Sequence, residues 1–302
     1  MRGVVTYYSG AASPRGPDFS FRKVMLTMFQ RSSSIRLYAI LAGALAFMAT
    51  PASAQFVPRT LNDPATGEKY HIEASAGYWS PIANMSIASQ SLGIAGSKID
   101  FKKDLGLKDQ RFNAMHLILR PGVKHKLRLD YIPIKFEQSA TITRNITFNG
   151  QIYRIGLPVN SSLSWRAYRF GYEYDFIHKN RGFGGLILEA KYTDVEASLQ
   201  SPAVQEYAHA KAPIPSIGGI MRFYPVANIS ITGELTGITI PASLSEQYNA
   251  HYADLDIYGT VNFSDNVGAK VGYRRLDVAY VIEKDTGNFV LKGLYFGVVA
   301  RF

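Results

Sequence analysis

Cysteine is absent from the 302 residues, which excludes a disulfide scaffold, a thiolate metal centre and a cysteine nucleophile. Charged residues make up 19% of the chain and apolar residues 47%, whereas a disordered chain would contain more charged and fewer apolar residues. A chain of this composition and length can bury a sizeable core in one or two domains. After residue 54 no apolar run reaches the roughly 18 residues of a membrane-spanning helix, so none is predicted.

The formal net charge of +10 would suit a nucleic acid or an anionic membrane. It is unevenly spread, because residues 1–54 contain six Lys and Arg and one Asp. The rest of the chain is left with 27 basic and 22 acidic residues. Half of the excess thus lies in a segment that we expect to be removed, and no nucleic-acid partner is predicted.

That segment resembles a secretory signal peptide. Arg31 and Arg36 precede an apolar run at 38–49, and Ala52-Ser53-Ala54 comes directly before Gln55. The flank is positive, the apolar run is too short to span a bilayer, and the residues at the −3 and −1 positions are small. These features favour a signal peptide cleaved after Ala54 over a buried core helix. Met25 and Met28 stand where such a peptide normally begins, so residues 1–54 are predicted to be an over-extended start plus the signal peptide.

The remaining sequence alternates between apolar and polar residues. Between Tyr168 and Phe176 every even position is Tyr or Phe, and the odd positions are Arg169, Gly171, Glu173 and Asp175. The same period of two returns at 252–263 and 293–302. This period predicts strands with one apolar and one polar face, in either a soluble sandwich or a membrane barrel.

Three observations favour the barrel: the export signal, the aromatic strand ends and an alternation of long and short connections. About ten strands are predicted, with eight as the runner-up count, at 70–79, 110–120, 125–137, 163–177, 183–198, 212–224, 228–241, 251–263, 267–282 and 289–302. Short turns are expected at 121–124, 178–182, 225–227 and 264–266. The sequence therefore predicts an all-β, closed antiparallel transmembrane barrel over 69–302, after a short periplasmic segment at 55–68.

The end of the chain resembles the last strand of bacterial outer-membrane proteins. Apolar residues alternate up to a terminal phenylalanine, at Leu294, Phe296, Val298, Ala300 and Phe302. The resemblance implies that the barrel-assembly machinery reads these residues during biogenesis. The chain as a whole is similar to the broad opacity and OmpA-type family of small outer-membrane barrels, and segments 99–107 and 124–131 are similar to an uncharacterised subgroup. This resemblance implies that the protein lies in the outer membrane of a Gram-negative bacterium, surrounded by lipid and lipopolysaccharide.

The search for chemistry yields no catalytic, cofactor or metal site. His251 lies near Asp254 and Asp256 in sequence, but strict alternation directs the histidine to lipid and the two carboxylates inward. Ser201 and the serines at 243–245 lack the turn that exposes a nucleophile. Asp100, Asp104 and Asp109 alternate with lysines, which indicates a solvated charge run. We therefore predict a protein that is not an enzyme.

Fourteen charged residues share the inward parity, seven basic and seven acidic. They are Arg128, Asp130, Arg169, Glu173, Asp175, Glu189, Lys191, Arg222, Glu234, Asp254, Asp256, Lys270, Arg274 and Arg301. A balanced set in a narrow barrel favours a lumen filled by ion pairs, because buried charges persist only when they are paired. Gly272 and Gly293 share this parity and leave room for an inward Tyr295 ring.

The predicted role is structural or a surface interaction, with loops 80–109 and 138–162 exposed. Asn149-Gly150 is typical of a hairpin turn and predicts a protruding ribbon in the second loop. The alternative is a narrow, porin-like pore for small solutes, and a membrane-embedded hydrolase is less favoured.

Overall fold

The structure, a computed structural model, describes residues 64–88, 96–148, 150–202, 205–240, 248–282 and 285–302. The expected signal peptide, with its cleavage residues Ala52, Ala54 and Gln55, lies outside the described residues. So do residues 55–63 of the segment expected in the periplasm.

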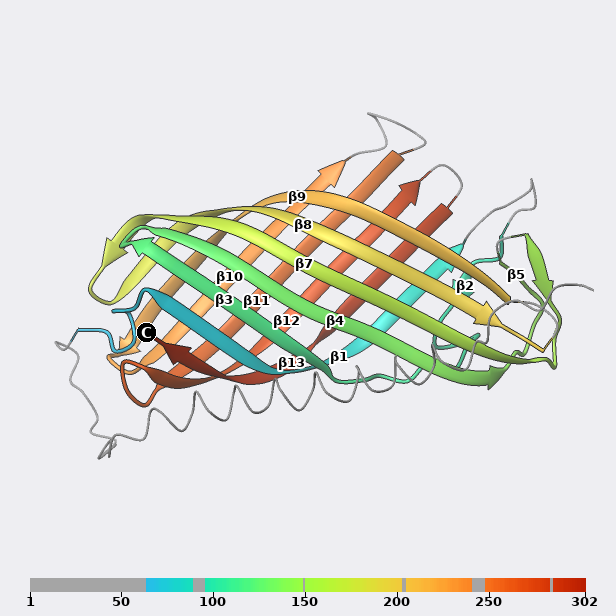
Figure 1. Ribbon diagram of the computed structural model, residues 1–302, viewed down its shortest axis with the longest axis horizontal. Coiled ribbons are helices and arrows are strands. Elements are labelled where there is room, and N and C mark those ends of the chain that lie inside the picture. The colour runs from blue at the N-terminus through green and yellow to red at the C-terminus, as the bar shows by residue number, and fades with distance from the viewer. Residues whose placement is uncertain (1–63, 89–95, 149, 203–204, 241–247, 283–284) are drawn as a thin grey trace, which may run out of the picture. The chain divides into compact units, whose positions relative to one another are not determined.

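Ten long antiparallel strands account for most of the described chain and close into a barrel. They are β1 (Ile72–Ala88), β3 (Phe112–Gly122), β4 (His125–Thr141), β7 (Pro158–Lys179), β8 (Gly182–Gln200), β9 (Gln205–Val226), β10 (Ile229–Ile240), β11 (Tyr248–Asn262), β12 (Val267–Ile282) and β13 (Asp285–Arg301). Neighbours along the chain pair with each other, and β13 also pairs with β1 (Figure 1). The predicted count of ten is confirmed.

Three short strands complete the described elements. β2 (Ile99–Asp100) pairs with the end of β1, and β5 (Ile146–Phe148) pairs with β6 (Gln151–Tyr153) in a separate hairpin. Gly150 turns this hairpin with a φ of 80°, a conformation in which a side chain is unfavourable. The hairpin expected from Asn149-Gly150 is therefore present, but it forms a sheet of its own rather than a continuation of β4 and β7, and its Ile146, Phe148 and Tyr153 side chains are buried.

The short connections gather at one end of the barrel, which we call the short-turn end. They consist of residues 123–124, 180–181, 227–228 and 263–266. The other end, called the long-loop end, carries strands that run further than their alternation suggested. Residues 205–211 continue β9 along β8, although a loop was expected at 199–211. Pairing with a long neighbouring strand extends a ladder through a sequence whose own pattern is weak.

The outward face is apolar, as the parity predicted. Phe170 is 55% exposed and its neighbour Arg169 is 7% exposed. Tyr131, Tyr168 and Tyr192 lie side by side on β4, β7 and β8 and form an outward aromatic row, here called the tyrosine row, as expected at a bilayer interface. Among the described residues no helix is long and apolar enough to span a membrane. The fold is that of an outer-membrane β-barrel.

The interior differs between the two ends. Charged side chains fill the half towards the short-turn end, and apolar side chains fill the half towards the long-loop end. The described parts of the first two loops contribute to this apolar half: Phe101 and Leu105 are 2% exposed, and Phe148 is fully buried. The expectation that these loops are surface-exposed is therefore wrong for these three residues, whereas Ile152 and Ile155 of the second loop are about 60% exposed, as expected. The three buried side chains fold inward because the charged strand residues fill only the half towards the short-turn end and leave the long-loop end of the interior to apolar groups.

Candidate functional site

The inward charges form one network, and Arg169 on β7 is at its centre. Its guanidinium contacts carboxylates on four other strands, namely Asp130 at 3.0 Å, Glu234 at 3.1 Å, Glu189 at 3.4 Å and Asp254. Arg274 on β12 also binds Asp254, at 2.7 Å. Asp130 and Glu189 lie on the adjacent strands β4 and β8. The contacts with Glu234 on β10 and Asp254 on β11 cross the lumen, so these side chains occupy its width.

A second part of the network lies nearer the short-turn end. Arg128 connects the two parts, because it contacts Glu234 at 2.6 Å and Glu173 at 2.9 Å. Lys126 binds Glu173 at 2.6 Å and Asp175 at 2.9 Å. Glu173 and Lys126 are each 1% exposed. Charges so far from water are stable only with partners at this distance.

Positive and negative charges are equal in number in the described lumen and at its short-turn end. The basic residues are Arg120, Lys126, Arg128, Arg169, Lys191, Arg222, Lys270, Arg274 and Arg301, and the acidic ones are Glu68, Glu73, Asp130, Glu173, Asp175, Glu189, Glu234, Asp254 and Asp256. Nine of each leave no net charge to attract ions of one sign. The arrangement fits a plug better than a selective channel.

The structure places all fourteen sequence-predicted charges on inward positions of the strands. Twelve are buried, and Asp256 and Lys270 are partly buried. Asp256 accepts a hydrogen bond from the Tyr295 hydroxyl at 2.8 Å. A Cβ added at Gly272 would lie 2.7 Å from the Tyr295 ring, so this glycine does make room for the tyrosine.

Sequence reasoning missed four charged members of the network: Glu68, Glu73, Arg120 and Lys126. Lys126 has the parity of Arg128 and Glu73 has the parity of Ser75, which is also buried, so alternation could have found both. Arg120 directly precedes the turn predicted at 121–124, where parity is hard to assign from the sequence. Glu68 precedes the barrel, and no local pattern marks it as part of the lumen.

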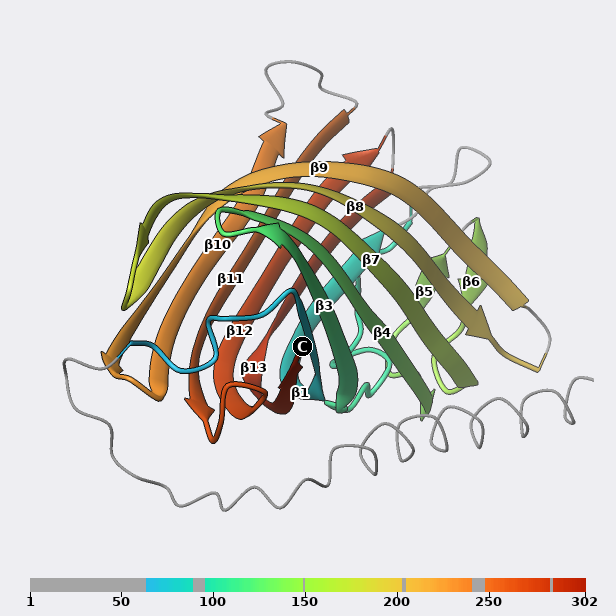
Figure 2. The same ribbon diagram turned by 60° about the vertical axis from the view of Figure 1, so that its left-hand side comes forward.

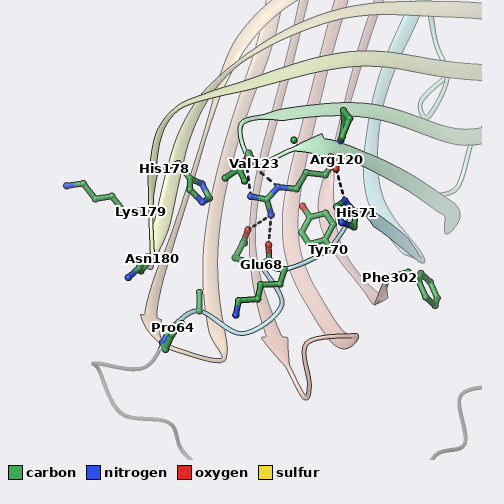
Figure 3. Close-up of a pocket in the computed structure, with 14 residues that line it drawn as sticks. Pro64, Glu68, Tyr70, His71, Arg120, Val123, His178, Lys179, Asn180 and Phe302 are labelled. Carbon is green, nitrogen blue, oxygen red and sulfur yellow. Dashed lines mark hydrogen bonds and ion pairs between the residues drawn. The ribbon is translucent and has the colours of Figure 1, made fainter.

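Glu68 belongs to a segment that runs across the short-turn end before β1. We call residues 64–71 the strap. Its Glu68 carboxylate accepts hydrogen bonds from Arg222 at 2.9 Å and from the Tyr224 hydroxyl at 2.6 Å. Arg120 donates to the Glu68 backbone carbonyl (Figure 3). Burial alone would raise the pKa of Glu68, but the Arg222 guanidinium and the Tyr224 hydroxyl hold this pKa below its usual value.

Further bonds hold the strap at both sides of Glu68. Asn262 on β11 donates to the Thr66 carbonyl at 2.7 Å, and Gly67 donates to Asp265 at 2.8 Å. Tyr70 is 6% exposed and lies between the guanidinium groups of Arg120 and Arg301. The strap thus contacts β3, β9, β11 and β13 and covers charged residues of the lumen.

A cavity of about 620 Å³ lies beside the strap. Figure 3 shows Glu68 and Arg120 within it, with His71 and His178 on its two sides. Phe302, at the end of the chain, also lines it. The cavity is a vestibule at the short-turn end, and the strap and the buried charges lie between it and the long-loop end.

The residues considered for catalysis remain apart. His251 is exposed on the outer face and bonds to Thr239 at 3.0 Å, whereas Asp254 is buried in the lumen. The residues 243–245 lie outside the described part of the chain, and Ser201 is buried at the end of β8. In the described chain no three or more histidine or carboxylate side chains gather as metal ligands would.

The C-terminal residues predicted to guide assembly are mostly on the outer face. Leu294, Phe296, Val298 and Phe302 are each more than half exposed, and Ala300 is partly buried. This is the orientation that a lipid-facing series requires. Whether the assembly machinery reads them stays a prediction.

No known protein family matches the sequence, and no curated protein is significantly similar to it. Similar solved structures include the outer membrane protease OmpT from Escherichia coli (8% identity, 80% of this chain and 100% of that one, TM-score 0.48). Others are Ail, the attachment invasion locus protein of Yersinia pestis (9%, 75% and 97%, 0.33), and the Pseudomonas putida toluene transporter TodX (7%, 85% and 93%, 0.31). These likenesses concern the fold and assign no activity to this chain.

Proposed function

We propose that the chain is a non-enzymatic barrel of the bacterial outer membrane with a structural or surface-interaction role and a lumen closed to ions. The observation that carries this proposal is the cluster around Arg169, whose four carboxylate partners come from four other strands. Side chains that meet across a narrow lumen leave little room for hydrated ions. The strap adds a second closure at the short-turn end.

The orientation follows from the ends of the barrel. In bacterial outer-membrane barrels short turns face the periplasm and longer loops face the outside. The short-turn end, the strap and Phe302 therefore belong on the periplasmic side. Lipid and lipopolysaccharide would surround the apolar outer face, and the assembly machinery would meet the β13 strand from the periplasm.

The absence of an enzymatic role rests on the geometry of the candidate groups. A general base needs a hydrogen-bonded partner that orients it and a nucleophile or water within reach. His251 has only a threonine as its described hydrogen-bond partner. Its carboxylate neighbours in sequence are on the opposite face of the sheet, where Asp254 binds two arginines and Asp256 accepts a hydrogen bond from Tyr295.

The alternative, a narrow pore for small solutes, is favoured by one observation, the vestibule of about 620 Å³ beside the strap. Solutes could collect there if the strap moved. Balanced charges above the vestibule argue against a steady current, since they bind one another more closely than they could bind a hydrated ion.

Planar-bilayer recording of the purified barrel distinguishes the two functions. We expect no steady conductance from the wild type at neutral pH. The double variant Arg169→Gln/Asp254→Asn removes opposite charges together and serves as the more open comparison. Gel mobility with and without heating shows that each sample is folded. A steady current through folded wild type would overturn the closed lumen and favour the pore.

A further inference from the structure

The barrel wall is incompletely paired between β9 and β10. Their ladder begins near the short-turn end and stops at Ile217↔Gly237. Beyond this pair β9 continues along β8 as far as Gln205, and β10 continues along β11 as far as Ile240. Figures 1 and 2 both show β9 curving away from β10 over this stretch.

Two prolines explain why the ladder stops. The Tyr224 amide donates to the Arg181 carbonyl on the β8 side, and the β8–β9 register runs without a shift from Phe223 to Gln205. Even-numbered residues of β9 therefore direct their amides to β8, and odd-numbered ones direct theirs to the β10 side. Pro213 and Pro215 are odd-numbered and have no amide hydrogen to give to β10. The gap is thus encoded in the sequence.

The gap begins at the level of the tyrosine row, which marks the outer interface of the membrane in the orientation proposed above, and the inference rests on that orientation. Tyr192, the last member of the tyrosine row, is directly opposite Pro213 in the β8–β9 register. Ile217, where the ladder ends, is 55% exposed on the apolar outer face. A molecule dissolved in the outer leaflet would therefore meet an opening in the wall rather than a continuous sheet.

An apolar cavity of about 200 Å³ lies behind this gap. Pro213, Ile214 and Pro215 line it from β9, and Ile238 and Ile240 line it from β10. Its inner wall is aromatic, with Trp165, Tyr252, Tyr280 and Phe289. A cavity of about 150 Å³ with apolar walls is enough to hold one benzene ring, so this one suits a single-ring molecule.

Trp165 lines the cavity, and its indole nitrogen lacks a described partner. Trp165 is 2% exposed, and its Nε1 is buried without a hydrogen-bond acceptor among the described residues. A buried donor without an acceptor is costly, and an indole nitrogen normally finds one. An oxygen on a bound molecule would supply it.

The floor of the cavity separates it from the charged network. The Tyr252 ring lines the cavity, and Lys191 Nζ lies 3.9 Å from the centre of that ring. Below it Lys191 binds Glu189 at 3.0 Å. An apolar molecule in the cavity would not move on through the ion pairs, so the axial lumen below the cavity is closed to it.

We propose that this cavity is a binding site for a small single-ring molecule with one hydrogen-bond-accepting oxygen, which enters sideways from the outer leaflet between β9 and β10. The walls bind the ring, and Trp165 Nε1 donates to the oxygen. This function is separate from the closed axial lumen, because the site opens through the wall.

Uptake of two volatile probes by the full chain in lipid nanodiscs tests the proposal. Acetophenone and ethylbenzene have nearly the same shape, and only acetophenone has an acceptor oxygen. Headspace gas chromatography measures the uptake of each, with empty nanodiscs as the reference for partition into lipid. We expect saturable uptake of both, and acetophenone should bind about fivefold more tightly, as one hydrogen bond implies.

Four variants locate the binding. Ala250→Phe fills the cavity and should abolish saturable uptake, with Ile214→Phe as a second filling variant if the first does not fold. Ala253→Phe, on the lipid-facing side of the same strand, should leave uptake unchanged. Trp165→Phe should lower the affinity for acetophenone to that for ethylbenzene.

Each contrary result overturns a stated part of the proposal. Uptake no greater than in empty nanodiscs would eliminate the site, and equal uptake by folded Ala250→Phe would move it elsewhere. Equal affinities of the wild type for both probes would remove the role of Trp165. A co-purified acyl chain that ethylbenzene does not displace, detected by native mass spectrometry, would make the occupant a lipid.

Discussion

Arg301 Nε donates to Glu73 Oε2 over 2.5 Å, so a buried ion pair joins the last strand of the barrel to the first. The two residues are directly opposite in the β1–β13 register, and Asn262 accepts a second bond from the same guanidinium at 2.8 Å. Closure of the barrel thus depends on a charged contact as well as on the backbone ladder.

Glu73→Ala should destabilise the folded barrel by about 3–5 kcal/mol, because it leaves the Arg301 guanidinium buried without its carboxylate. Urea titration followed by gel mobility measures the free energy of unfolding. Glu137→Ala is the matched control, since it breaks the exposed pair with Lys135 and should cost about 1 kcal/mol or less. Equal losses would show that burial of the pair does not matter.

The lipid face can be tested at Ile257, which is 49% exposed at an outward position of β11. Ile257→Arg should cost about 2–4 kcal/mol if the side chain lies near the bilayer midplane. Asn288→Arg, at an exposed position of β13 near the long-loop end, should cost about 1 kcal/mol or less. Unfolding in lipid vesicles measures both. Normal stability of Ile257→Arg would show that this position does not face lipid.

Phe302 combines two contributions that two variants separate. Its backbone exchanges hydrogen bonds with Ile72 at 2.9 and 3.0 Å, whereas its ring is 53% exposed. Phe302→Ala keeps the backbone bonds and removes the ring that the assembly machinery is expected to read. It should lower the amount of heat-modifiable protein in the outer membrane at low expression, while the purified variant refolds in detergent as wild type does. Wild-type amounts in the membrane would contradict the assembly signal.

The strap should leave the barrel in acid. Its Glu68 has a pKa held below the usual 4.5, so the ionised carboxylate stabilises the bound strap above that value. The stabilisation is lost as the pH falls through the lowered pKa. A spin label at Lys69→Cys, the only cysteine in such a chain, should become mobile in this range.

Glu68→Gln combined with the same label provides the control for the strap. The amide lacks the charge that binds Arg222, so the label should already be mobile at neutral pH. Gel mobility at each pH shows whether the barrel itself stays folded. A label that remains immobile in folded Glu68→Gln would show that the carboxylate does not hold the strap.

The prolines of β9 should keep the wall open. Pro213→Val/Pro215→Val restores two backbone donors on the β10 side, so the ladder can extend beyond Ile217. Hydrogen exchange at 238–240 should slow, and the rate of ethylbenzene uptake should fall. An unchanged rate would place the entrance elsewhere. Leu235→Val, on the outer face where the ladder is intact, serves as the control.

Alternation predicted the ten strands and the inward charges because each depends only on neighbouring residues. Alternation could place Arg169 and Asp254 in the lumen. It could not predict that the two side chains contact each other, because 85 residues separate them in the sequence. Glu68 could not be found at all, because its position depends on where the strap crosses the closed barrel. The gap was missed for a similar reason: Pro213 and Pro215 mark an edge only once the direction of each amide is known.

The distribution of Arg169 contacts has a consequence for biogenesis. Its partners come from β4, β8, β10 and β11, so a sheet that contains only the first few strands leaves this cation without most of its anions. In lipid, an incomplete barrel would therefore carry the free-energy cost of unpaired charges, which the finished barrel does not have. Insertion strand by strand is therefore unfavourable, and the wall must come together before the bilayer surrounds it, in one cooperative event.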